Sequence, residues 1–137
     1  MKKILLLLLL AIFCSPVFAF ELPAGKTINK VAVEKGIETY TQTINQEPND
    51  EIAYINRAFL YFLSDDVVKA IADYDSLIKI NPNNEEYYLN RGYLKHISHK
   101  RLEALSDYDM ALKIKPDYAF AYNNRGVVLA ELGRNSE

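Results

Sequence analysis

Two histidines are the first residues in this sequence whose type and spacing could do chemistry. His96 and His99 are the only histidines, and residues three apart share one face of a helix, as the first two ligands of a zinc site often do. The nearest carboxylate is Glu103, and the single cysteine, Cys14, lies far away near the N-terminus. Because a zinc site needs further ligands at this place, we expect the chain to bind no metal.

Pairs of acidic residues are the second candidate for chemistry. Asp73 with Asp75, and Asp107 with Asp109, resemble the carboxylate pairs of hydrolases. The two pairs are 34 residues apart, which is typical of residues that belong to a repeated scaffold. No Ser or Cys lies in a nucleophile motif and no glycine-rich phosphate loop is present. We therefore predict that the protein is not an enzyme and uses no cofactor.

The 34-residue spacing extends through the sequence and is marked by three prolines, Pro48, Pro82 and Pro116. Many other residues keep the same period, and so many agreements at one spacing indicate an internal repeat. They are Tyr54, Tyr88 and Tyr122; Asn56-Arg57, Asn90-Arg91 and Asn124-Arg125; Ala58, Gly92 and Gly126; and Ala70 with Ala104.

Each period contains two amphipathic helical patterns. Apolar residues recur at steps of three and four over about 51–63 and again over about 67–80, and the next unit repeats both patterns. Proline ends a helix, and Asn83 with Glu86 three residues later predicts a capping box at the start of the following one. Gly92 and Ala104 should let the two helices of a unit approach closely, with tyrosines filling the wider parts. The turn at 98–100 contains no glycine, so we expect it to be less regular than the others. The fold class predicted is all-α.

These units resemble the tetratricopeptide repeat. The resemblance is carried by Tyr88-Leu89-Asn90-Arg91-Gly92 and Tyr122-Asn123-Asn124-Arg125-Gly126, by Ala in the second helix and by the closing Pro. It implies a short right-handed helical solenoid of helix hairpins. The expected domain is 29–137, with a half unit at 29–48 whose helix, about 30–46, caps the solenoid, complete units at 51–84 and 85–118, and an incomplete unit at 119–137.

The resemblance further implies a protein-binding module or scaffold, whose concave groove is formed by the first helix of each unit and holds a protein or peptide. The groove positions of the family fall on Ile52, Ile55, Asn56, Phe59, Phe62, Glu86, Leu89, Asn90, Tyr93, His96, Phe120, Asn123, Asn124 and Val127. Among these we predict six peptide-binding residues, which are Asn56, Phe59, Phe62, Asn90, Tyr93 and Asn124. An asparagine amide can hold a peptide backbone or can serve the solenoid's own hydrogen bonds, and both readings stay open. Arg57, Arg91 and Arg125 are expected to be structural and to pair with Asp73, Asp75, Asp107 and Asp109. No lysine or arginine occupies a groove position, so a clamp for a terminal carboxylate is absent and we expect an apolar or aromatic ligand.

The N-terminus has the three parts of a secretory signal. Lys2 and Lys3 precede the apolar run 4–13, which is too short to span a membrane, and Ala19 ends a small-residue cleavage site. We predict a signal peptide at 1–19, cleavage after Ala19, a linker at 20–28, and a secreted or periplasmic protein that does not insert in the membrane. Lipid attachment at Cys14 is the alternative, which a bulky Phe before the cysteine disfavours. Without Lys2 and Lys3, 14 of the 16 basic residues face 18 acidic ones, which gives no reason to expect nucleic acid as a partner.

The last predicted helix, about 118–132, is apolar on nearly every side. A terminal helix of a solenoid normally shows a polar face to water. We therefore expect one of two explanations. The chain is a truncated remnant of a longer array, or it is an assembly subunit that docks through its exposed terminal helix and forms a homo-oligomer through residues 118–132.

Overall fold

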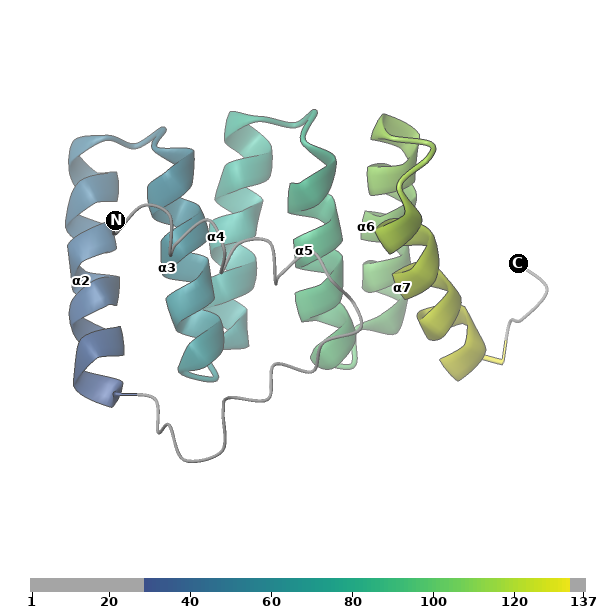
Figure 1. The fold of residues 1–137 in the computed structure, drawn as a ribbon, viewed down its shortest axis with the longest axis horizontal. Helices are drawn as coiled ribbons and strands as arrows, with labels where there is room; N and C mark the ends of the chain where they lie inside the picture. The colour runs from purple at the N-terminus through teal and green to yellow at the C-terminus, as the bar shows by residue number, and fades with distance from the viewer. Residues whose placement is uncertain (1–28, 134–137) are drawn as a thin grey trace.

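The computed structural model describes residues 29–133, and all regular secondary structure in that range is α-helical. The six helices are α2 (Lys30–Gln46), α3 (Glu51–Leu63), α4 (Val67–Ile80), α5 (Glu85–Ile97), α6 (Arg101–Ile114) and α7 (Ala119–Glu131). Figure 1 shows them following one another along the long axis in chain order, each antiparallel to the next. The predicted all-α helical solenoid is confirmed, and the predicted helix bounds agree with the observed ones to within one residue.

Side chains that accept hydrogen bonds from free backbone amides fix the starts of the first four helices. Asp50 accepts from the amide of Ala53, and Asn84 accepts from the amide of Glu86 at 3.0 Å. The predicted capping box at Asn83 is therefore wrong, because the cap is its neighbour Asn84. The repeat itself points to Asn84, since Asn84 stands 34 residues after the cap Asp50.

The turns that follow α3, α5 and α7 each contain a residue in the left-handed region. Asp65 has φ 64°, His99 has φ 62° and Gly133 has φ 70°, again at the 34-residue spacing. The turn at 98–100 makes the same three backbone hydrogen bonds as the turn at 64–66. The expectation of a less regular turn is wrong, because His99 accepts the strained conformation that glycine adopts at little cost.

The hairpins are held together by close approach at small residues. A Cβ atom on Gly92 would lie 2.7 Å from Cε1 of Tyr108 and 3.2 Å from Cβ of Asp107, so only glycine leaves room for α6 there. The Tyr108 ring fills that space and is fully buried, and Ala104 is buried beside it in the same core cluster. The predicted close packing of the two helices at Gly92 is confirmed, with Tyr108 as the ring that fills the gap.

The predicted signal peptide, cleavage site and linker lie outside the described residues. Between residues 29 and 133, none of the helices has the length and apolar character needed to span a bilayer.

Candidate functional site

The first helices of the hairpins, α3, α5 and α7, carry the positions predicted to line a groove. Several of these positions are exposed side chains that could meet a ligand. They are Ile52, Glu86, Tyr93, Phe120, Asn123 and Val127, while Ile55, Phe59, Phe62, Asn90, His96 and Asn124 are half-buried and Asn56 and Leu89 are buried. The apolar and aromatic character expected for this surface is therefore presented mainly by α5 and α7.

Asn56 is enclosed by the fold. Its side chain is 6 % exposed, and its amide nitrogen donates to the carbonyl of Ile52 at 2.8 Å, one helical turn back. This hydrogen bond belongs to the scaffold's own network, the second of the two readings that the sequence left open for the asparagines. Asn90 and Asn124, at the same place in the following units, keep part of their side chains at the surface.

The repeated arginines bind carboxylates inside the scaffold. Arg57 donates from Nε and Nη2 to the two oxygens of Asp73 at 3.0 and 2.6 Å, and from Nη1 to the hydroxyl of Thr41 at 3.1 Å. Each contact lies 16 residues away, so the guanidinium of α3 joins the helix before it to the helix after it. The hydrogen bond to Asp73 raises the pKa of Arg57.

Arg91 repeats this arrangement one unit later. It binds Asp107 in the same two-pronged way, at 2.9 and 2.6 Å, and Asp75 at 2.7 Å from Nη1. In the last unit Arg125 donates to Asp109 at 2.7 Å. The prediction that these arginines are structural and pair with the repeated aspartates is confirmed. The acidic pairs are thus partners of arginine, which explains their period.

The two histidines do not share a site. His99 lies in the turn after α5, whereas His96 is on α5 and its Nε2 lies 3.0 Å from Oε1 of Glu131 on α7. Arg101 of α6 donates to the other oxygen of Glu131 at 2.6 Å. In the part of the chain that the structure describes, no three His, Cys, Asp or Glu side chains are placed to hold a metal ion.

The cluster of His96, Arg101 and Glu131 is a feature that the sequence interpretation missed. It ties α7 to both helices of the preceding hairpin, and Arg101 followed by His96 holds the pKa of Glu131 below its ordinary range. The signal was available, because Glu131 stands 35 residues after His96, close to one repeat length, and so falls beside it on the neighbouring first helix.

Comparison with known proteins agrees with this arrangement. A family model described as TPR repeat matches residues 103–133. The first TPR of Spaghetti (RPAP3), solved with the HSP90 peptide SRMEEVD, superposes with a TM-score of 0.68 at 24 % identity, over 75 % of this chain and 82 % of that domain. This is a tetratricopeptide-repeat fold. The predicted resemblance to the family is confirmed.

Two further solved structures show the same TPR architecture. The second TPR domain of human RPAP3, in complex with the HSP70 peptide SGPTIEEVD, has a TM-score of 0.64 at 23 % identity and covers 70 % of this chain and 80 % of that one. MamA has a TM-score of 0.71 at 19 % identity, and the match covers 78 % of this chain but 63 % of MamA. No curated protein matches the sequence.

Proposed function

We propose that this TPR chain is an exported protein-binding module that holds an extended polypeptide segment along the face formed by α3, α5 and α7. The observation that carries the proposal is the set of exposed side chains on that face, with Tyr93 on α5 and Phe120 and Val127 on α7. Aromatic and aliphatic side chains of this kind bury well against a ligand's apolar groups. TPR neighbours of the same fold are solved with peptides bound, which supports a peptide as the ligand.

The chemistry of the face argues against the acidic peptides that those neighbours hold. Both of their peptides carry Glu-Glu-Val-Asp at the end. Arg57 and Arg91 of this chain are engaged by aspartates of the scaffold, and the face itself carries Glu86. The ligand that fits is therefore a segment with apolar or aromatic side chains and no excess of negative charge.

Asn90 and Asn124 supply the polar part of the proposed site. A half-buried carboxamide offers both a donor and an acceptor at the surface, which suits the backbone of an extended peptide. Phe59 and Phe62 lie on α3 at the same face and are half-buried, so they add apolar area at one end. Asn56, being enclosed, contributes to the position of α3 and leaves direct contact with the ligand to the other two asparagines.

The test is binding of a peptide array to the double variant Asn90→Ala with Tyr93→Ala. We expect the peptides selected by the wild-type chain to bind at least about tenfold more weakly, which corresponds to about 1.4 kcal/mol. The matched control removes an exposed polar and an exposed apolar side chain elsewhere, Asn83→Ala with Val68→Ala. Unchanged binding by the first variant, or equal loss in both, would remove this face from consideration.

Export is a separate part of the proposal, supported by the basic start, the apolar run and the cleavage site that ends at Ala19. Mass spectrometry of the purified protein should find Phe20 as the first residue. A diacylglycerol on Cys14, or an intact Met1, would contradict it.

A second candidate function is assembly through the terminal helix, and the exposed Tyr122, Phe120 and Val127 on α7 favour it. The readout that separates the two candidates is a pull-down from the envelope fraction. A single partner in fixed stoichiometry indicates an assembly subunit, whereas a varied set of peptides indicates the groove.

A further inference from the structure

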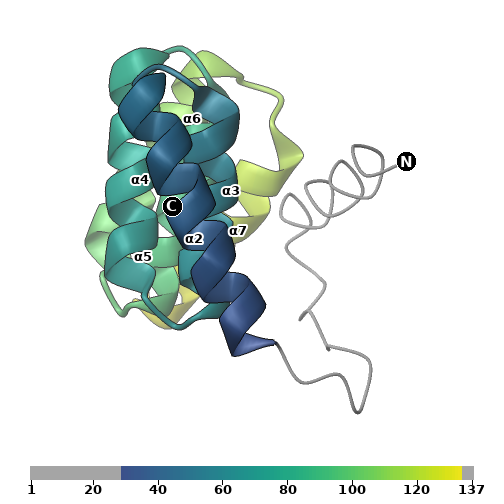
Figure 2. The same ribbon diagram turned by 90° about the vertical axis from the view of Figure 1, so that its left-hand side faces the viewer.

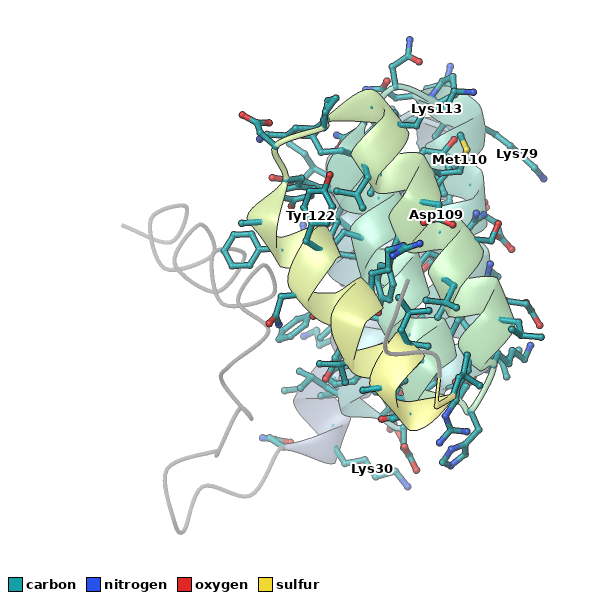
Figure 3. The ribbon with its side chains drawn as sticks, turned by 90° about the vertical axis from the view of Figure 1, so that its right-hand side faces the viewer. Lys30, Lys79, Asp109, Met110, Lys113 and Tyr122 are labelled. Carbon is teal, nitrogen blue, oxygen red and sulfur yellow. The ribbon has the colours of Figure 1, made fainter. Side chains whose placement is uncertain are left out.

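The described helices leave one unmatched helix at each end of the stack. α3 pairs with α4 and α5 pairs with α6, each as a first and a second helix of one unit. In residues 29–133, α2 is a second helix that has no first helix before it, and α7 is a first helix that has no second helix after it. Figure 2 looks onto the end formed by α2, and Figure 3 looks onto the opposite end, formed by α7 and α6.

The outer face of α7 has the shape that receives a second helix. Gly126 stands 34 residues after Gly92, and Gly92 is covered by Tyr108 and Asp107 of α6. A Cβ atom on Gly126 would meet nothing within 4 Å in residues 29–133 outside its own stretch of helix. Tyr122 is 55 % exposed, although its counterpart Tyr88 is 7 % exposed. Figure 3 shows Tyr122 projecting from α7 into solvent.

The outer face of α2 carries the matching side chains of a second helix. Thr39, Tyr40 and Thr43 stand two repeats before Asp107, Tyr108 and Ala111, the residues of α6 that are buried in the preceding hairpin. In α2 the corresponding residues are exposed or half-buried. Tyr40 is thus the ring that, in a complete unit, would cover a glycine on a first helix.

Covering this face would leave its two threonine hydroxyls hydrogen-bonded. The hydroxyl of Thr39 donates to the carbonyl of Lys35 at 2.9 Å, and the hydroxyl of Thr43 donates to the carbonyl of Thr39 at 3.1 Å. A donor that is already bonded within its own helix loses little when water is removed. The two threonines therefore add little cost when the α2 face is covered.

We propose that α2 of one copy packs on α7 of a second copy and completes a helix hairpin between the two chains. Tyr40 then covers Gly126 of the other copy as Tyr108 covers Gly92. Thr39 then lies beside the guanidinium of Arg125, at the position that Asp107 occupies beside Arg91. Its hydroxyl oxygen accepts a hydrogen bond from Arg125, as the hydroxyl oxygen of Thr41 accepts one from Arg57. The two contacting surfaces differ, so the interface is heterologous and each added copy extends the solenoid.

The end face offers apolar area beyond α7. A cavity of about 410 Å³ lies between α6 and α7, lined by the apolar side chains of Leu105, Met110 and Leu129 among others. Asp109 and Lys113 border it, and Figure 3 shows both beside Met110 on the same end of the stack. An incoming helix would close the open side of this cavity, as the next helix of a repeat array does.

The experiment is sedimentation velocity of the natural protein, purified with whatever N-terminus processing leaves, over about a hundredfold range of concentration. We expect the wild-type chain to form dimers and longer species as the concentration rises. Gly126→Glu should leave a monomer, because the new side chain occupies the space of Tyr40, while its Cβ atom meets nothing within 4 Å among the described residues beyond its own stretch of helix. Thr39→Arg should also leave a monomer, because it places a cation beside Arg125. Thr39→Asp should associate about tenfold more tightly, as a charge-assisted pair replaces a hydroxyl.

Mixing the two blocked variants decides the geometry. Gly126→Glu keeps a working α2 face and Thr39→Arg keeps a working α7 face, so together they should form a 1:1 dimer that does not grow. Ala72→Glu and Ala72→Arg, at an exposed position of α4, are the matched controls and should associate as wild type does. A monomer at every concentration would overturn the proposal. So would association that Thr39→Arg leaves intact, which indicates pairing of α7 with α7, or a mixture that stays monomeric.

Discussion

Gly92 and Gly126 occupy the same position in successive repeats, and they should respond to the same substitution in opposite directions. Replacing a helical glycine with alanine stabilises a helix by about 1 kcal/mol where there is room for the methyl group. At Gly126 there is room, because among the described residues no atom outside its own stretch of helix lies within 4 Å of the new Cβ. We expect Gly126→Ala to raise the free energy of unfolding by about 0.5–1 kcal/mol.

At Gly92 the new methyl group would overlap the ring of Tyr108. The distances of 2.7 Å to Cε1 and 3.0 Å to Cδ1 are shorter than ordinary contacts, and this ring is fully buried and cannot swing away. Overpacking of this kind costs about 1–3 kcal/mol. After the gain in helix propensity is subtracted, Gly92→Ala should lower the free energy of unfolding by about 1 kcal/mol.

Urea unfolding followed by far-ultraviolet circular dichroism measures both changes, in protein dilute enough to be monomeric. The difference between the two variants isolates the overpacking, because helix propensity contributes equally to each and cancels. An unchanged slope of free energy against urea would show that both variants unfold in the same way as wild type. If the two substitutions moved the unfolding midpoint in the same direction by the same amount, the packing of Tyr108 over Gly92 would be refuted.

Two further predictions concern charged groups. Asp107→Asn should lower the free energy of unfolding by about 3–5 kcal/mol, because the buried carboxylate holds both Arg91 and Lys95, at 2.6 and 2.8 Å. Asp109→Asn should cost less than about 1 kcal/mol in the same urea assay, because the Asp109 carboxylate of the pair with Arg125 is mostly exposed. Equal losses in the two variants would contradict this difference between a buried and an exposed carboxylate. The pKa of Glu131 is lowered on folding, so its contribution to stability is present above its ordinary value of 4.5 and is lost as the pH falls through its folded value. Unfolding of wild type and Glu131→Gln should therefore differ at neutral pH and converge in acid, and a difference that persists in acid would show that its charge is not the cause.

The 34-residue period was sufficient to predict the fold, because the repeated residues are those that pack the helices against one another. Residues of similar size recur at the positions of Tyr108, Ala104 and Gly92, because each position has a fixed volume between the helices. In a closely packed interior even one additional methyl group disturbs the packing of the hairpin. The arginine network was predictable for the same reason, since Arg91 and Asp107 keep a constant separation of 16 residues. The helix cap at Asn84 follows from its 34-residue spacing to Asp50, whereas the local capping-box pattern points to its neighbour Asn83.

The contacts between neighbouring units were harder to read. The residue types of the His96–Glu131 contact do not recur in the other units, so only the spacing of about one repeat length points to it. The strained His99 turn was misjudged because propensity favours glycine there, whereas the flanking helices impose the conformation on whatever residue is present. The periodic pattern also does not predict which residues are exposed at the two ends of the stack. Gly92 and Gly126 have the same place in the repeat, and they differ only because α6 packs against Gly92.

Departures from the period mark the surface on which we propose that the ligand binds. At the groove positions the type changes from unit to unit, as in Phe59, Tyr93 and Val127, which no common packing requirement explains. The asparagines at positions 56, 90 and 124 do not change, so they suit what every unit shares, namely the scaffold or the backbone of a bound peptide, and they do not select among ligands. The hydrogen bond from Asn56 to its own helix is the kind of shared constraint that such constancy requires. We therefore expect Tyr93 and Val127 to determine which peptides the proposed groove binds. Exchanging their side chains should change the set of peptides that bind. Asn56→Ala should instead lower the free energy of unfolding and leave that set of peptides unchanged.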